Sequence, residues 1–301
     1  MTTDWMMIKT IALSVTIVLG LAAQAHAQQP PLRQHTATSA EALTLSAARK
    51  RVRGADVSMS VQGGTRIITA NGLPSHKVGT FPNAGNPNRI VAQRYSFRMP
   101  VSPRPGRARE LPPTTAFGVA VNGVPFDPNA AEYWRGNPRA GWQYNALGGA
   151  VSLGLDANYG HVQPTGAYHY HGLPVGLMQQ LDWSASTPSP LIGFAADGFP
   201  IYALTATVNG QVVRMTSSYQ LKSGARPGGA QPGGRYDGAF VQDYVYRAGS
   251  CTLDECNGAT VRTAEYPNGT YAYFLTDSFP VIPRCLKAAV GEGFAKGGGR
   301  R

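Results

Sequence analysis

Two histidines stand two residues apart in the segment PTGAYHYHGLP at 164–174, where His169 and His171 alternate with Tyr168 and Tyr170. In a β-strand, residues i and i+2 point to the same face, so the imidazoles share one face and the phenols the other. Neutral imidazole nitrogens held close together are ligands that Zn²⁺ and Cu²⁺ accept readily. The spacing therefore indicates a metal site, and the alternative is a pair of structural histidines bonded to backbone or tyrosine groups.

Three more residues are candidates for the same site. His161 lies eight residues before His169, and a turn in QPTG folds the chain back toward the pair; otherwise His161 is a loop histidine that bonds its own turn. His76 follows the strand exit NGLP. Asp197, in DGFP, is a candidate metal ligand, a partner that orients a histidine, a general base, or the cap of its own turn.

The chain begins with a pattern typical of secretory signal peptides. Lys9 precedes an apolar run, and AHA at 25–27 matches a cleavage site. The apolar run is too short to span a bilayer comfortably, and no other segment approaches ~20 apolar residues. We therefore expect residues 1–27 to be a signal peptide and the mature protein to be periplasmic or extracellular, with no transmembrane segment.

Composition predicts a mainly β fold with long ordered loops. The chain has 36 Gly and 23 Pro, and short runs of Val, Tyr, Phe and Thr alternate with turn signals such as NG, DG and GG. We expect a flexible leader over 28–55, one domain over 56–290 and a disordered tail over 291–301. The net charge of +11 allows nucleic-acid binding, but export and the scattered arginines argue against nucleic acid as a partner.

Three short segments recur in the same order. GVAVNGVPFD matches GFAADGFPIY, LDANYG matches LDECNG, and PTGAYHYH matches PNGTYAYF. These repeats predict two related β units, at about 117–174 and 192–283, that arose by internal duplication and pack into one domain. Copy two has Ala272 and Phe274 where copy one has His169 and His171, so the histidine face is expected to point inward. Copy two also contains an insert at 223–238, expected to be a dispensable surface loop.

Three cysteines follow the signal peptide, at 251, 256 and 285. Export favours one disulfide among these three and leaves one thiol over. We expect Cys256 to pair with Cys285, and the rival pairing is Cys251 with Cys256. The role of Cys251 is left open.

The motifs FPNAGNPN, GVAVNGVPFDP, LDANYGHVQPTGAYHYHG, LIGFAADGFPIY and FPVIPRC together resemble the bacterial YHYH domain family over about 57–286. The resemblance implies an exported, mostly β protein whose reaction is unassigned. The second copy in that family often contains GTYHY, whereas this chain has Ala272 in place of the histidine. A second site in copy two is therefore not expected.

The leading hypothesis is an exported β-rich protein that binds one transition metal ion, Cu or Zn, through His169 and His171, with His76, His161 and Asp197 nearby. One alternative is a hydrolase, either metal-dependent or using a histidine with Asp197 as the base. Another is a non-catalytic cell-surface or carbohydrate-binding module lined by aromatic residues, namely Trp134, Trp142, Tyr144, Tyr168 and Tyr170. No G-x-S-x-G, P-loop or dinucleotide-binding fingerprint is present.

Overall fold

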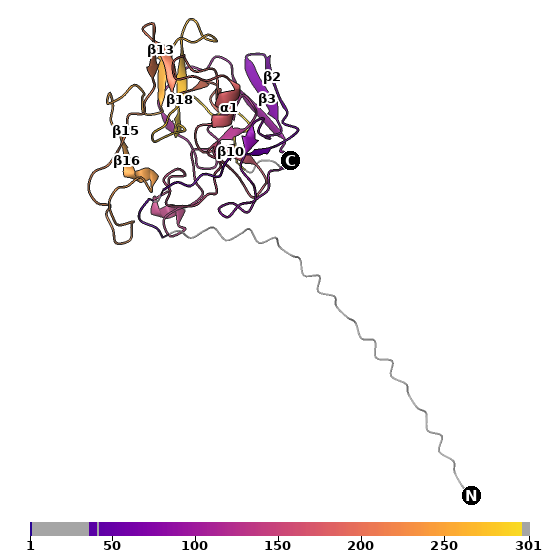
Figure 1. Ribbon diagram of the computed structural model, residues 1–301, viewed down its shortest axis with the longest axis vertical. Coiled ribbons are helices and arrows are strands. Elements are labelled where there is room, and N and C mark those ends of the chain that lie inside the picture. Colours follow the sequence, from indigo (N-terminus) through magenta and orange to yellow (C-terminus); the bar gives the residue numbers. More distant parts are fainter. Residues whose placement is uncertain (2–35, 41, 297–301) are drawn as a thin grey trace. The chain divides into compact units, whose positions relative to one another are not determined.

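The computed structural model describes Met1 and residues 36–40 and 42–296. The predicted signal peptide, apart from Met1, lies outside the described residues, as do parts of the leader and tail at 28–35, 41 and 297–301. The described chain is mainly β, as the composition predicts (Figure 1). None of its helices is long and apolar enough to cross a bilayer.

The largest sheet has eight strands in the order β17-β18-β12-β11-β7-β8-β10-β9. Most residues of its inner strands are buried, because packed side chains cover both faces. The strands are β7 (Gly118–Ala120), β8 (Pro125–Phe126), β9 (Gly160–Val162), β10 (Tyr168–Tyr170), β11 (Gly193–Ala195), β12 (Pro200–Ala203), β17 (Gly258–Val261) and β18 (Thr270–Leu275).

The two halves of this sheet have the same connectivity. Outward from the antiparallel β7–β11 pair, each half continues with an antiparallel, a parallel and again an antiparallel pairing. The predicted repeat units at 117–174 and 192–283 each supply one half. The duplication itself stays a prediction, but the matching connectivity defines equivalent positions in the two halves.

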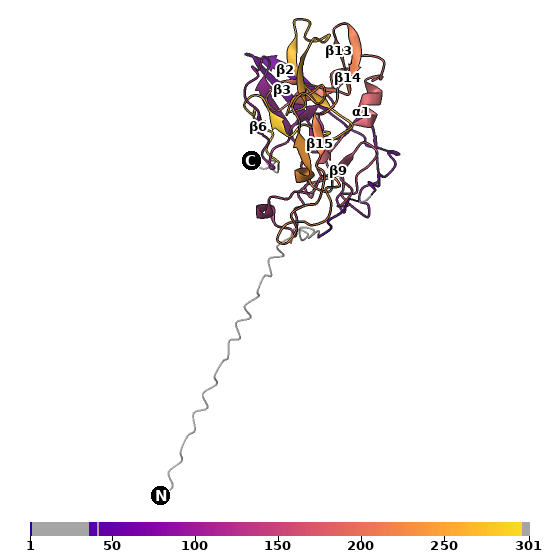
Figure 2. The ribbon, with the colours of Figure 1, turned by 90° about the vertical axis from the view of Figure 1, so that its left-hand side faces the viewer.

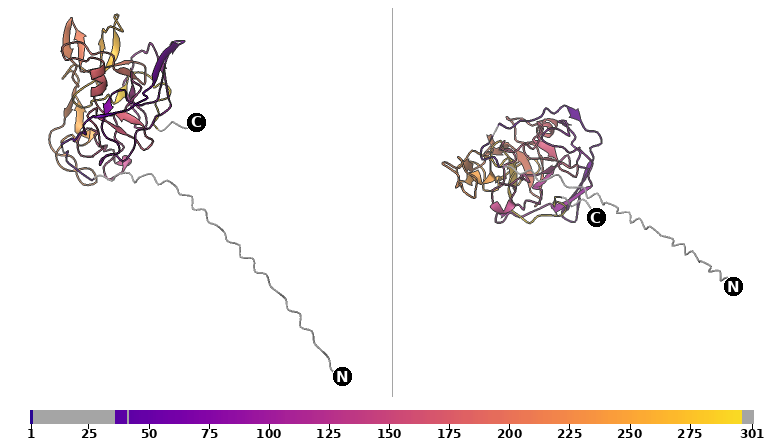
Figure 3. Two further views of the ribbon diagram at one scale, coloured as in Figure 1. Left: turned by 45° about the vertical axis from the view of Figure 1, so that its right-hand side comes forward. Right: turned by 90° about the horizontal axis from the view of Figure 1, so that it is seen from below.

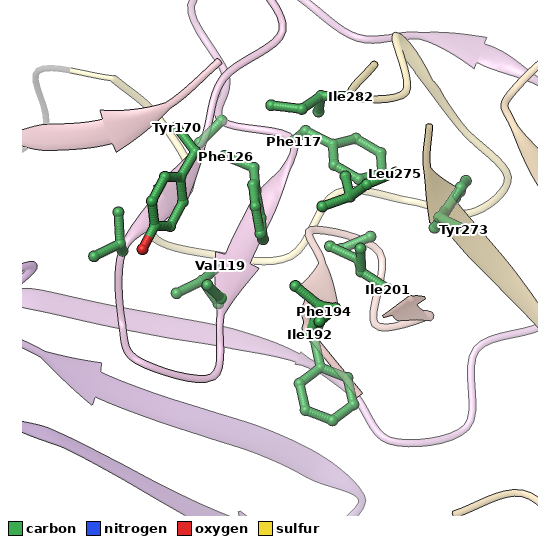
Figure 4. Packing of buried hydrophobic residues seen from close by; sticks show 14 of the residues in the cluster. Phe117, Val119, Phe126, Tyr170, Ile192, Phe194, Ile201, Tyr273, Leu275 and Ile282 are labelled. Atoms are coloured by element: carbon green, nitrogen blue, oxygen red, sulfur yellow. The ribbon is translucent and has the colours of Figure 1, made fainter. Parts of the chain in front are cut away.

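Large side chains fill one face of the sheet across both halves. Figure 4 shows Tyr170 and Tyr273 toward opposite ends of this core, with Val119, Phe126 and Ile201 between them. All five are fully buried or nearly so. The hydrophobic effect therefore joins the two halves into one body, since neither half could cover these residues alone.

Smaller elements surround the large sheet (Figures 1 and 2). A three-stranded sheet stands at one side, visible in indigo in Figure 3; it contains β2 (Val57–Gln62), β3 (Thr65–Ala70) and β5 (Tyr95–Pro100). Four strand pairs follow: β1 (Lys50–Arg51) with β4 (Lys77–Val78), β6 (Arg109–Glu110) with β19 (Cys285–Leu286), β13 (Thr205–Val208) with β14 (Gln211–Arg214), and β15 (Tyr219–Leu221) with β16 (Tyr244–Tyr246). The helical segments are α1 (Val175–Gln180) and the short 3₁₀ turns η1 (Pro138–Ala140) and η2 (Val241–Asp243).

The described parts of the predicted leader and tail make specific contacts with the domain, while their expected flexibility stays a prediction. Ser46 bridges to Asp156, and strand β1 pairs with β4. Phe294 is buried, and Lys296 Nζ lies 2.6 Å from Asp127 Oδ1. Neither segment has hydrophobic periodicity. Their order comes from backbone hydrogen bonds and single anchoring side chains, which periodicity does not report.

The insert at 223–238 is likewise more than a surface loop. The Arg226 side chain is fully buried, and its guanidinium binds the Asp243 carboxylate through two contacts of 2.6 and 2.8 Å. It also pairs with Asp237, donates to the Thr38 carbonyl and lies over the Phe240 ring. The loop therefore supplies the charge that neutralises a buried aspartate, so we now expect its removal to destabilise the protein.

The disulfide joins Cys256 to Cys285, the favoured pairing, and Cys251 is free and exposed. Because the bond spans 29 residues, we expect Cys285→Ser to lower the free energy of unfolding by about 2–4 kcal/mol. Thermal melts of purified protein provide the measurement, and Cys251→Ser is the matched control with an unchanged melting temperature. Equal melting temperatures for Cys285→Ser and wild type would contradict the expectation.

Candidate metal centre

The hairpin of β9 and β10 places three imidazoles on one face. The antiparallel register pairs His161 with His169, and residues that are directly opposite each other share a face. His171 lies on the same face because it is two residues beyond His169. Its backbone N–H donates to the Tyr159 carbonyl at 2.7 Å, which extends the pairing past the end of the strand. Local β geometry is therefore enough to gather the three rings.

The three Nε2 atoms converge. His171 Nε2 lies 3.0 Å from His169 Nε2 and 3.1 Å from His161 Nε2. One nitrogen from each ring lies within 4.8 Å of those of the other two, so the trio forms a possible metal-binding group. His169 and His171 are each only 3% exposed, and His161 is partly buried.

Backbone carbonyls fix the tautomers of two of the rings. His161 Nδ1 is 2.8 Å from the Leu153 carbonyl, and His169 Nδ1 is 3.3 Å from the Ala167 carbonyl. A carbonyl oxygen only accepts, so these contacts favour the tautomer with the proton on Nδ1. His161 Nδ1 also lies 3.2 Å from the Asn86 amide nitrogen, a longer contact than its 2.8 Å bond to Leu153. In the neutral rings the Nε2 lone pairs of His161 and His169 then both face His171 Nε2. A cation among the three rings would be bound by all three nitrogens at once.

Electrostatics disfavour a proton as that cation. Burial lowers the pKa of His171 well below its usual range, and the neighbouring His169 and His161 lower it further. Burial also lowers the pKa of His169, an effect that nearby Asp127 partly opposes. His169 and His171 are therefore neutral imidazoles at neutral pH, the form that binds metal.

His76 lies on the other face of β10. Its Nδ1 donates to the Lys77 carbonyl at 2.9 Å, and its Nε2 accepts from the Tyr170 hydroxyl at 2.5 Å. Tyr170 also receives a hydrogen bond from the Asn122 amide at 3.0 Å. Because Tyr170 alternates with the histidines along the strand, this network is separated from the triad by the sheet itself. The structure thus does not bring His76 to the predicted site.

Asp197 is bound in the second half of the sheet. Its Oδ2 accepts from the Tyr273 hydroxyl at 2.6 Å and from two backbone N–H groups, of Lys287 and Ala288, at 3.1 and 3.0 Å. Burial raises the pKa of Asp197, while these hydrogen bonds act in the opposite direction. Asp197 and Tyr273 are the counterparts of Asn122 and Tyr170. The carboxylate is therefore a fixed acceptor under a core tyrosine and is not part of the histidine group.

The second half also shows what the triad replaces. In β17 and β18, Ala259 pairs with Ala272, just as His161 pairs with His169, and Phe274 occupies the place of His171. Ala272 and Phe274 are fully buried in an apolar cluster. The sequence repeats predicted two of these three equivalences. The third follows from the hairpin register, which depends on the loop at 163–167.

Two cavities reach the triad. One, of about 410 Å³, is lined by His171 together with Arg284. The other, of about 740 Å³, is lined by His169, Asp127 and Lys296. Neither Arg284 nor Asp127 was a candidate from the sequence, although Asp127 ends the repeated segment GVAVNGVPFD and Arg284 lies in FPVIPRC. Their proximity to the histidines arises only from tertiary packing.

The aromatic residues suggested as a carbohydrate platform are all buried in the cores. Tyr144, Tyr168 and Tyr170 have no exposed surface, and Trp134 and Trp142 are 5% and 8% exposed. A sugar-binding platform needs exposed aromatic faces, so these five residues do not supply one. Their role here is packing within the core clusters.

Comparison with known proteins agrees with the resemblance seen in the motifs. A family model described as YHYH protein matches residues 96–288, which is more than half of the chain and contains all three clustered histidines. No curated protein and no solved structure gives a significant match. The chain therefore belongs to the YHYH protein family.

Proposed function

We propose that this protein is exported and binds one transition metal ion through His161, His169 and His171. The observation that supports the proposal most strongly is the convergence of three Nε2 atoms, two of them on rings whose Nδ1 protons are held by backbone carbonyls. Carbonyl-oriented histidines are a recurrent arrangement at metal centres, since the outer hydrogen bond fixes the ring and leaves Nε2 as the ligand atom.

The spacing fits a metal of the size of Zn²⁺ or Cu²⁺. With metal–nitrogen bonds of ~2.0–2.1 Å, neighbouring ligand nitrogens in a tetrahedral site are roughly 3.3–3.4 Å apart. The two observed contacts, 3.0 and 3.1 Å, are close to that value, and all three ligand nitrogens lie within 4.8 Å of one another. Three imidazoles leave at least one coordination position for water or a ligand. Elemental analysis of protein purified without a histidine tag would identify the metal.

A metal-dependent hydrolase is the second candidate function. His171 and His169 each line a cavity, so a molecule in either cavity has access to the edge of the triad. A metal ion with an open position lowers the pKa of a bound water and so supplies a nucleophile. Turnover assays with ester, phosphate and glycoside substrates, run with metal-loaded and chelator-treated protein, distinguish this function from metal binding alone.

The metal-free protein should lose stability as the pH falls below about 6.5. His169 and His171 have folded-state pKa values below the usual 6.5, so the unfolded chain binds protons first as the pH falls. Each such proton lowers the free energy of unfolding by up to about 1.4 kcal/mol per pH unit between 6.5 and the folded-state pKa. Thermal melts of chelator-treated protein at pH 7, 6 and 5 measure this loss.

The double variant His169→Gln, His171→Gln is the control for this pH series. It removes the two titrating groups, so its melting temperature should depend less on pH over the same range. Parallel profiles for the variant and the wild type would assign the acid sensitivity to other groups. Saturating metal should flatten the wild-type profile near neutral pH, because the metal stabilises the folded state.

A further inference from the structure

The 410 Å³ cavity beside His171 combines an apolar wall with one cationic group. Its wall is supplied from segments far apart in the chain: Leu147, Leu173, Phe279 and Ile282. Ile282 also belongs to the main core cluster, so this wall is anchored in the body of the domain (Figure 4). An apolar enclosure with a few placed polar groups is the usual character of a small-molecule site.

Arg284 is the cation of this cavity. Its guanidinium donates to three neutral oxygens at 2.6 Å, those of the Pro128 carbonyl and the Asn129 and Gln143 side chains. Within residues 36–40 and 42–296, no carboxylate lies within ion-pair distance of it, and burial lowers its pKa to about 10. The guanidinium is thus held in place and charged at neutral pH. The carboxylates of Asp127 and Glu110 act on it electrostatically, but neither forms an ion pair with it.

The other charged groups of this cavity do not offset Arg284. Asp277 also lines it, but its carboxylate is paired with Arg214. An anion entering the cavity would therefore meet one guanidinium that has no ion-pair partner, the group best suited to a carboxylate.

We propose that this cavity binds a small carboxylate with an apolar body, the carboxylate at Arg284 and the body along the apolar wall beside His171. The proposal builds on the metal-binding function, since a ligand so placed lies next to the metal position. The cavity thus specifies the class of organic ligand, whereas the histidine triad specifies only a metal ion. Inorganic phosphate lacks the apolar body and should bind more weakly than the carboxylate.

Benzoate and hexanoate are suitable probes, with benzamide and inorganic phosphate as comparisons. In calorimetric titrations of the full mature protein at pH 7, we expect benzoate and hexanoate to bind, and benzamide and phosphate to bind at least tenfold more weakly. Arg284→Gln should weaken benzoate binding at least tenfold, and Arg284→Lys should restore part of it. Arg247→Gln, which removes an exposed arginine outside this cavity, should leave benzoate affinity unchanged.

Arg284 also holds a loop, so a second variant tests the site without touching it. Ser278 is exposed at the cavity, and Ser278→Trp should narrow the cavity and weaken benzoate binding at least fivefold with an unchanged melting temperature. The proposal would be overturned if wild type bound neither benzoate nor hexanoate. It would also be overturned if the folded variants Arg284→Gln and Ser278→Trp bound benzoate as tightly as wild type. Metal content measured on the same samples separates the two hypotheses. If protein purified without a chelator carries no metal but still binds benzoate through Arg284, the metal function fails and the carboxylate site stands.

Discussion

His169→Ala and His171→Ala should each remove most of the metal that copurifies with the mature protein. Each change deletes one of three converging nitrogens, and His171 is the ring whose Nε2 contacts both of the others. Removing a hydrogen-bond partner of a metal ligand typically weakens metal binding roughly 10- to 100-fold. Removing a ligand itself should weaken it at least as much. Elemental analysis after dialysis is the measurement, and His161→Ala should show the same loss.

His76→Gln is the matched control for these variants. His76 is also a buried histidine, but it binds Tyr170 on the opposite face of the sheet. We expect His76→Gln to retain its metal, while its melting temperature falls because the Tyr170 hydroxyl loses its acceptor. If all four histidine variants retain as much metal as wild type, the three rings form a structural cluster and the metal hypothesis fails.

Arg226→Met should destabilise the protein by about 3–5 kcal/mol, because it leaves the buried Asp243 carboxylate without a counter-charge. Both side chains of the pair are fully buried. The remaining partners of Asp243 Oδ2 are the N–H groups of Gly238 and Phe240, at 3.0 and 3.2 Å. For a domain of this size the loss corresponds to a melting temperature lower by very roughly 6–20 °C.

Arg235→Met is the control within the same loop. Arg235 is exposed, so its loss should change the free energy of unfolding by no more than about 0.5 kcal/mol. The double variant Arg226→Met, Asp243→Leu removes both charges and should recover part of the stability lost by Arg226→Met. A melting temperature for Arg226→Met equal to that of wild type would mean that Asp243 finds another partner or takes up a proton.

The features that the sequence predicted are the ones that local geometry determines. Alternation along a strand placed His169 and His171 on one face, and the repeats showed that this face is buried in the other half of the sheet, at Ala272 and Phe274. His161 was a candidate because a turn follows it. That it stands directly opposite His169 depends on the length of the loop at 163–167, and one residue more or less would move it to the other face.

The features that could not be predicted depend on contacts between distant segments. His76 and Asp197 were grouped with the pair because they stand at similar strand exits, yet each binds a core tyrosine on the face away from the imidazoles. The equivalence of Asn122 with Asp197, visible in the repeats, was the one available signal for that arrangement. Arg284 and Arg226 had no such signal, since a buried arginine is recognised only when the oxygens around it are known.

The matching connectivity of the two half-sheets has a consequence for how the protein tolerates change. One hairpin places imidazoles where the other places alanine and phenylalanine. The polar groups and the buried apolar side chains therefore occupy equivalent positions in separate halves. Substitutions at Ala259, Ala272 or Phe274 should therefore alter heat resistance and leave metal occupancy intact. Substitutions at the histidines should instead lower metal occupancy. Chemistry can thus drift in one hairpin while its counterpart keeps the molecule folded.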